Sequence, residues 1–122
     1  MKYLIDSNII IYHLNGENIA SEFISSNRDK CAISVITYIE VLSFDLTSDE
    51  EKNIKDLLES FFIIETSKEI AVQSVRNRKI KKIKVPDNII ASTAQMHGLT
   101  LVTHNVEDFT ALDVELLDIF SE

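Results

Sequence analysis

Four carboxylate side chains stand at positions of this sequence where they could do chemistry together: Asp6, Glu40, Asp87 and Asp108. Each lies beside an apolar, strand-like segment or within an otherwise apolar helix. If the strands are parallel, all four gather at one edge of the sheet, where ligands of open parallel sheets bind. Carboxylates crowded together do not stay ionised without a cation. The pattern therefore predicts a divalent-metal site, and metal-assisted hydrolysis of a phosphodiester is the chemistry to test.

The available ligand types favour Mg²⁺, with Mn²⁺ as a substitute. Carboxylate oxygens without a nearby histidine or cysteine pattern are hard ligands, which suit these ions better than Zn²⁺. His13, His97 and His104 show no ligand spacing, and Cys31 stands alone in an apolar segment. A lone cysteine of this kind is expected to be a small buried residue. The sequence also has no glycine-rich phosphate loop and no nucleophile elbow.

Three of the carboxylates have a second, structural interpretation as helix-capping residues. Asp6 could cap the helix after the first strand, and Asp87 could cap the helix that follows Pro86. Asn105 and Asp108 could cap a short helix. Capping does not explain why such residues follow several different strands, so the metal interpretation is favoured.

Glu40 is the most informative of the four because it interrupts an apolar helix expected over 35–44. The polar residues of that segment are Thr37, Glu40 and Ser43, whose spacing of three places them on one stripe. Thr37 and Glu40 could instead form a capping box, but the helix would then have to begin after Ile36. A glutamate on the one polar stripe of a buried helix is predicted to take part in chemistry.

The elements that position these residues are short apolar strands alternating with helices. Strands are expected at Lys2–Ile5, Cys31–Ser34, Phe61–Glu65, Leu99–Thr103 and Leu116–Phe120. Helices are expected over 9–14, 19–25, 35–44 and 48–59, from Ser67 into a basic segment, and over 87–97 between Pro86 and Gly98. This alternation predicts βα units and a parallel sheet covered on both faces. The expected fold is a three-layer α/β/α sandwich around a central, mainly parallel five-stranded sheet.

Size and composition indicate one ordered domain over residues 1–122. The chain has 122 residues, of which 45% are hydrophobic and two are glycine. That length supports a single core. Nothing approaches the ~18 consecutive apolar residues of a membrane span. A charged residue at position 6 is too early for a signal peptide, so we expect a cytoplasmic protein without a membrane partner.

The charge distribution gives two opposed indications about nucleic acid. A net charge of −8 argues against such a partner. However, six of the twelve lysines and arginines form one segment: Arg76, Arg78, Lys79, Lys81, Lys82 and Lys84. This basic segment is either a solvated helix face or a surface that contacts phosphates.

Taken together, the sequence resembles the PIN-domain ribonucleases, specifically the VapC-type toxins of bacterial and archaeal toxin–antitoxin pairs. The matching segments are YLIDSN at 3–8, ISVITYIEVL at 33–42, PDNIIASTA at 86–94 and GLTLVTHNVEDF at 98–109. They occur in the family's order along essentially the whole chain. Two positions depart from the family pattern. His104 stands where an arginine is common and Asn88 where a small residue is common, and both bear on substrate preference.

The resemblance implies a Mg²⁺-dependent endoribonuclease, usually a homodimer, neutralised by a small antitoxin whose tail enters the acidic site. It carries the catalytic and metal-binding roles onto Asp6, Glu40, Asp87 and Asp108, and the supporting polar roles onto Asn8, Thr37, Thr103 and Asn105. In this hypothesis Asp6 and Asp87 hold the principal ion with help from Glu40, Asp108 supports a second ion or acts through water, and the basic segment binds the RNA backbone.

Three other interpretations use the same residues. A catalytically inactive module with the PIN fold would use the acidic pocket to hold a basic peptide. A phosphoacceptor domain would also place an aspartate at a strand end, but it needs a lysine after a late strand, where this chain has His104 and Asn105. A DNA nuclease would use the same site as a ribonuclease.

Overall fold

Five short strands form one sheet in the computed structural model, which describes residues 1–121. They are β1 (Tyr3–Ile5), β2 (Cys31–Ser34), β3 (Phe62–Ile64), β4 (Thr100–Val102) and β5 (Leu116–Leu117). The strand order is β3-β2-β1-β4-β5, and every pairing is parallel. The chain therefore adds β2 and β3 on one side of β1, and then adds β4 and β5 on the other side. The switch point of the sheet lies between β1 and β4, where ligands bind in such folds.

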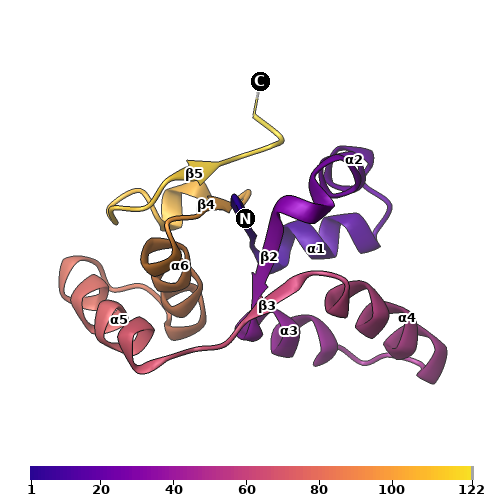
Figure 1. Ribbon diagram of the computed structural model, residues 1–122, viewed down its shortest axis with the longest axis horizontal. Helices are drawn as coiled ribbons and strands as arrows, with labels where there is room; N and C mark the ends of the chain where they lie inside the picture. The colour runs from indigo at the N-terminus through magenta and orange to yellow at the C-terminus, as the bar shows by residue number, and fades with distance from the viewer. Residues whose placement is uncertain (122) are drawn as a thin grey trace.

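Six α-helices connect these strands: α1 (Ser7–Leu14), α2 (Asn18–Asn27), α3 (Val35–Leu42), α4 (Ser48–Glu59), α5 (Lys68–Ile80) and α6 (Val85–His97). Two 3₁₀ turns, η1 (Arg28–Lys30) and η2 (Val106–Asp108), complete the described elements. Helices α5 and α6 lie on one side of the sheet, and α1, α2 and α4 lie on the other (Figure 1).

The core follows the alternation of side chains along each strand. Leu4 and Leu101 belong to the cluster under α5 and α6, whereas Ile5 and Val102 belong to the cluster under α1, α2 and α4. All four side chains are fully buried. Strands covered on both faces are expected to be mainly apolar, and the polar residues of β2 and β4, Ser34 and Thr100, lie at strand ends. The three-layer α/β/α fold predicted from the sequence is confirmed, with a sheet that is parallel throughout.

The starts of two helices decide between interpretations of a carboxylate: α3 begins at Val35 as expected, whereas α6 begins two residues before the expected start at Asp87. Helix α6 begins at Val85, and Lys84 is its N-cap residue. Asp87 therefore lies inside the first turn, where a negative charge is favourable, and does not cap the helix. The N-cap of α3 is Ser34, whose hydroxyl accepts a hydrogen bond from the backbone N–H of Ile36. The alternative in which Thr37 and Glu40 form a capping box is therefore wrong.

Helix α3 is shorter and less buried than expected. It ends at Leu42, not at residue 44, and the side chain of Ile39 is 54% exposed. The polar stripe is thus not the sole exposed part of this helix. At the end of α6, Gly98 adopts a φ of +62°, a left-handed conformation that glycine accepts without strain and that turns the chain into β4. No helix within residues 1–121 combines the length and apolar character that a membrane span requires.

Candidate active site

Asp6 occupies the centre of the site because it directly follows β1, the middle strand of the sheet. It is the N-cap residue of α1, and its Oδ1 accepts a hydrogen bond of 2.7 Å from the backbone N–H of Ser7. Its Oδ2 accepts a second bond of 2.8 Å from the hydroxyl of Thr103, which follows β4. Asp6 therefore caps α1, as the structural interpretation predicts, and its second carboxylate oxygen is bound to a residue at the end of β4.

The surroundings of Asp6 oppose its ionisation. The residue is 4% exposed, and burial is the largest of the causes that raise the pKa of its carboxyl group from 3.8 to about 6. The hydrogen bonds from Thr103 and Ser7 lower this pKa, whereas the charges of Asp87 and Glu40 raise it further. A buried carboxylate that feels two other carboxylates is stabilised by any cation placed among them.

Glu40 reaches the site through Ser7, the first residue of α1. The hydroxyl of Ser7 lies 2.7 Å from Oε1 of Glu40 and 3.0 Å from the hydroxyl oxygen of Thr37. A carboxylate accepts only, so the single hydroxyl hydrogen of Ser7 goes to Glu40, and Thr37 can donate in turn to Ser7. Thr37 is fully buried. The polar stripe of α3 thus faces the start of α1 at the carboxyl ends of β1 and β2.

Asp87 approaches the same site from the first turn of α6. Burial raises the pKa of its carboxyl group, followed in importance by the charges of Glu40 and Asp108. Lys84 acts in the opposite direction. Glu40 therefore acts on both aspartates, Asp6 and Asp87, and Asp108 acts on Asp87. The four carboxylates that the sequence singles out lie within electrostatic reach of one another as one connected set.

Asp108 is the most exposed member of this set and is held in place from the backbone. The ammonium group of Lys81 donates hydrogen bonds of 2.9 Å and 2.8 Å to the carbonyl oxygens of Glu107 and Asp108. Lys81 lies in the connection between α5 and α6, so this contact ties η2 to the start of α6. Residues 81–84, Asp87 and Asp108 line a small polar pocket of about 220 Å³.

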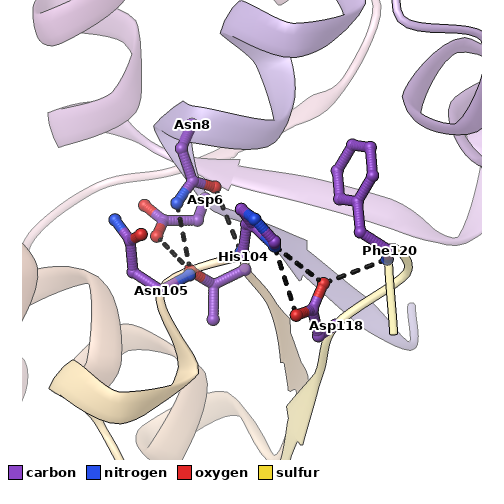
Figure 2. Close-up of polar contacts among 7 residues, drawn as sticks. Asp6, Asn8, His104, Asn105, Asp118 and Phe120 are labelled. Carbon is purple, nitrogen blue, oxygen red and sulfur yellow. Dashed lines mark hydrogen bonds and ion pairs between the residues drawn. The ribbon is translucent and has the colours of Figure 1, made fainter. Parts of the chain in front are cut away.

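Three of the four predicted supporting residues, all except Thr37, meet at one hydroxyl group. The Oγ1 atom of Thr103 bonds to Asp6 and accepts hydrogen bonds from the side-chain amide of Asn8, at 3.3 Å, and from the backbone N–H of Asn105, at 3.1 Å. Asn105 thus contributes its backbone to this network. Figure 2 shows Asn8 above the loop that carries His104 and Asn105, with Asp6 beside them.

The chain matches the model of the PIN domain over residues 3–115. The chain belongs to the PIN-domain family. Among curated proteins, Ribonuclease VapC10 of Mycobacterium tuberculosis is 31% identical over 113 residues, which cover 87% of this chain and 84% of that protein.

Solved structures show the same fold over nearly the whole length. A toxin–antitoxin complex from Klebsiella pneumoniae contains a chain that is 35% identical, with a TM-score of 0.87 and coverage of 97% of this chain and 98% of that one. A chain of VapBC-1 from nontypeable Haemophilus influenzae is 26% identical, with a TM-score of 0.83 and coverage of 99% and 100%. The family and the fold class predicted from the sequence are confirmed.

The donor set of this PIN domain fits a hard divalent cation. Its oxygen donors are carboxylates, and two of them have raised pKa values because they are buried near like charges. Within residues 1–121, no three acidic, histidine or cysteine side chains already stand in a coordinating arrangement. Mg²⁺ does not need one, because it keeps several waters and takes one or two carboxylates directly.

The basic segment divides into residues with internal contacts and residues without them. Arg78 donates a hydrogen bond of 3.0 Å to the carbonyl oxygen of Ile83, and Lys81 binds the η2 carbonyls described above. Lys82 and Lys84 are exposed. Helix α5 ends at Ile80, so the segment is a helix end followed by a connection and not one helix face.

Sequence reasoning did not place two polar contacts of the site. Ser7 directly follows Asp6, but nothing in the spacing of the sequence indicates that its hydroxyl binds Glu40, which is 33 positions away. Asp118 was not singled out, although it directly follows β5 and its carboxylate pairs with His104 at 3.2 Å. The strand-end rule did not reach Asp118, because the sequence predicts a strand through Phe120, whereas β5 ends at Leu117.

Proposed function

We propose that this PIN domain is a divalent-metal-dependent endoribonuclease and the toxin of a toxin–antitoxin pair. The observation that carries the proposal is the convergence of four carboxylates at the switch point of a parallel sheet. Burial, followed by the charges of neighbouring carboxylates in this set, raises the pKa values of Asp6 and Asp87. The ribonuclease class follows from the PIN-domain match and from the relation to Ribonuclease VapC10.

In this proposal Asp6 and Asp87 are the main ligands of the cation, Glu40 is a third carboxylate and Asp108 completes the site from its exposed side. When bound, Mg²⁺ or Mn²⁺ supplies the positive charge that draws a phosphodiester into an acidic site and assists its hydrolysis. Thr103 fixes the orientation of Asp6 through its hydrogen bond, and Ser7 does the same for Glu40. Asn8 and Asn105 hold the Thr103 hydroxyl in place.

Cationic residues of the basic segment border the acidic site and can bind the RNA backbone. Lys82 and Lys84 line the pocket that also contains Asp87 and Asp108. Lysine ammonium groups bind phosphates mainly through charge, so this part of RNA binding weakens as salt rises. Arg76 and Lys79 are exposed near the end of α5 and are the proposed further contacts of the RNA backbone, together with the other members of the segment.

An antitoxin is the proposed protein partner, and a homodimer is the proposed assembly. The structure from Klebsiella pneumoniae is a toxin–antitoxin complex and the one from Haemophilus influenzae is that of VapBC-1, and both support the antitoxin. An apolar groove of about 470 Å³ lies between α1, α3 and α4 and offers a surface for an apolar segment of such a partner. Its lining includes Ile11, Leu14, Phe44 and Ile54.

The cleavage of a mixed RNA pool tests the activity. Asp6→Asn and Asp87→Asn should abolish Mg²⁺-dependent cleavage, because each removes a negatively charged ligand while keeping the side-chain shape. Asp113→Asn, at an exposed aspartate outside the site, is the matched control and should cleave like the wild type. Undiminished cleavage by either site variant would overturn the assignment.

The same assay separates the nuclease from an inactive binding module. A module that holds a basic peptide in the acidic pocket would cleave no RNA at any metal concentration, yet would still lose peptide binding when Asp6 or Asp87 is neutralised. A parallel assay on single-stranded DNA decides between ribonuclease and deoxyribonuclease activity.

A further inference from the structure

His104 lies beside the acidic site without being one of its carboxylates. It follows Thr103 directly, and its backbone N–H donates a hydrogen bond of 3.5 Å to Oδ1 of Asn8. Asn8 binds Thr103, which in turn binds Asp6. His104 is thus connected to Asp6 through a short hydrogen-bonded path, and Figure 2 shows its ring between Asn8 and Asp118.

The imidazole of His104 is fixed by a carboxylate. Its Nδ1 lies 3.2 Å from both carboxylate oxygens of Asp118. Because a carboxylate only accepts, Nδ1 carries the hydrogen of this contact. Asp118 also accepts a hydrogen bond of 3.0 Å from the backbone N–H of Phe120, so one carboxylate contacts both the imidazole and the backbone of Phe120 (Figure 2). The Nε2 atom of His104 has no hydrogen-bond partner within residues 1–121.

Two aromatic rings support the imidazole from the side. The ring centroids of His104 and Phe120 are 5.0 Å apart, those of Tyr12 and His104 are 5.7 Å apart, and those of Tyr12 and Phe120 are 5.0 Å apart. All three pairs are edge-to-face, a favourable packing for aromatic rings. Tyr12 and Phe120 are half-buried, whereas the side chain of His104 is 43% exposed. The cluster therefore presents one rigid, accessible ring next to the cleavage site.

The charges around this ring favour a nucleobase over a phosphate group. The carboxylate of Asp118 touches the imidazole, and the acidic set around Asp6 lies close by, so the position repels an additional anion. Single-stranded RNA is recognised by stacking of unpaired bases on aromatic side chains, histidine included, and by hydrogen bonds to base edges. A flat ring with a free nitrogen provides both contacts.

We propose that His104, held by Asp118 and supported by Tyr12 and Phe120, binds a nucleobase of single-stranded RNA next to the scissile phosphate and sets the nucleotide preference of the enzyme. This inference rests on the proposed RNA substrate. It also assigns a role to His104, which stands where the family commonly has an arginine.

RNA binding by the Asp6→Asn protein tests the contact without requiring cleavage. Fluorescence anisotropy with short single-stranded oligomers of A, C or U should show a preferred base when His104 is intact. His104→Ala should weaken binding of the preferred oligomer about tenfold and remove the preference, since stacking on an aromatic side chain contributes a gain of that order. His104→Phe keeps a ring and should retain most of the affinity, while the order of the three bases changes because Nε2 is lost.

His97→Ala is the matched control, because His97 is an exposed histidine at the far end of α6. It should leave both affinity and preference unchanged. The inference is overturned if the intact protein shows no base preference, or if His104→Ala keeps the preference. It is also overturned if His104→Ala weakens all oligomers equally and lowers the salt dependence, which is the signature of a phosphate contact.

Sequencing the ends produced from a random RNA pool separates this inference from the proposed function. With active protein, His104→Ala should flatten the nucleotide preference at one position beside the cut. Identical preference in the wild type and the variant contradicts the base contact alone. Absence of cleavage by the wild type contradicts the nuclease assignment, and the binding measurement then decides on His104 by itself.

Discussion

The hydroxyl of Ser7 donates a hydrogen bond of 2.7 Å to Oε1 of Glu40 and so joins the first residue of α1 to the middle of α3. The two residues follow neighbouring strands, β1 and β2, and their contact is formed at the carboxyl edge of the sheet. The hydrogen bond thereby holds the half-exposed carboxylate of Glu40 toward Asp6 and Asp87.

Removal of this hydroxyl should weaken metal binding without unfolding the protein. For Ser7→Ala we expect the Mg²⁺ concentration that gives half-maximal cleavage to rise roughly tenfold, the lower end of the effects seen when a ligand's hydrogen-bond partner is removed. Ser43→Ala is the control, because the Ser43 hydroxyl bonds to the carbonyl oxygen of Ile39 in its own helix. Equal Mg²⁺ dependence of the two variants would show that Ser7 has no positioning role.

Asp6→Asn should stabilise the protein while it abolishes cleavage. The folded-state pKa of Asp6, about 6, lies above its ordinary value of 3.8, so the folded protein binds this proton more tightly than the unfolded chain. The free energy of unfolding of the wild type therefore falls as pH rises from about 4 to about 6 and stays lower above that range. An asparagine at position 6 is neutral, as the protonated carboxyl group of Asp6 is, so the variant avoids this loss of stability. We expect a gain of roughly 1–3 kcal/mol at pH 8, based on the free energy of a pKa shift of about two units.

Chemical denaturation at several pH values measures this difference. The gain should be present at pH 8 and disappear below about pH 4, where Asp6 is protonated in both states of the wild type. Added Mg²⁺ should raise the stability of the wild type at pH 8 but not that of Asp6→Asn, because only the wild type keeps the ligand. A variant less stable than the wild type at pH 8 would show that the ionised carboxylate of Asp6 does not destabilise the folded protein.

The same titration predicts that the metal requirement depends on pH. Protons and cations compete for Asp6 and Asp87, and the pKa values of both carboxyl groups are raised. The Mg²⁺ concentration for half-maximal cleavage should therefore be nearly constant above pH 7 and rise steeply as pH falls through about 6. Cleavage assays at fixed ionic strength measure this curve. A requirement that stays constant down to pH 5 would mean that these carboxylates are not the ligands.

Lys81 should act as a positioning residue for Asp108. Its ammonium group bonds to the carbonyl oxygens of Glu107 and Asp108, so Lys81→Met frees η2 from the start of α6. We expect a several-fold rise in the metal requirement and a loss of less than about 1 kcal/mol in stability, since these bonds are solvent-exposed. Metal titrations of cleavage, together with thermal unfolding, measure both quantities.

Lys82→Met provides the matched control from the same pocket. Lys82 is exposed, so its loss should raise the KM for RNA and reduce the salt dependence of binding while the metal requirement stays unchanged. If Lys81→Met behaves in the same way as Lys82→Met, then Lys81 contacts RNA and does not position Asp108.

The sequence was sufficient to predict the elements and the convergence of the carboxylates. Parallel strands place their carboxyl ends together, so Asp6, which directly follows β1, could be assigned to this edge from the sequence. Thr103 could be assigned only through the family resemblance. Glu40 could be assigned because a polar stripe on an apolar helix has a definite direction. The family match confirms the overall interpretation of these segments.

Contacts between side chains that are distant along the chain could not be predicted in the same way. The pairing of Ser7 with Glu40 depends on how closely α1 and α3 approach, and no periodicity encodes that distance. Lys81 appeared in a run of like charges, which concealed that its ammonium group binds two backbone carbonyls. Helix α6 begins before Pro86 because proline is well tolerated in a first turn, so the expected helix start was two residues late.

The buried polar layer between α5 and α6 explains a second departure from the family pattern. Asn88 is 4% exposed, and its side-chain oxygen accepts a hydrogen bond of 3.1 Å from the amide of Asn77, which also bonds to Ser92. A small residue at position 88 would leave part of this layer without a partner. The larger side chain of Asn88 in α6 is thus matched by the polar side chain of Asn77 in α5, which packs against it.

Anomalous diffraction from crystals soaked in Mn²⁺ addresses the cation site most directly, because it locates the ion without reference to activity. We predict one principal peak within about 2 Å of carboxylate oxygens from both Asp6 and Asp87, the distance expected for a hard divalent ion. Soaked crystals of Asp87→Asn should lose that peak. A principal peak elsewhere on the molecule, or none at a Mn²⁺ concentration that supports RNA cleavage, would contradict a shared cation among these carboxylates.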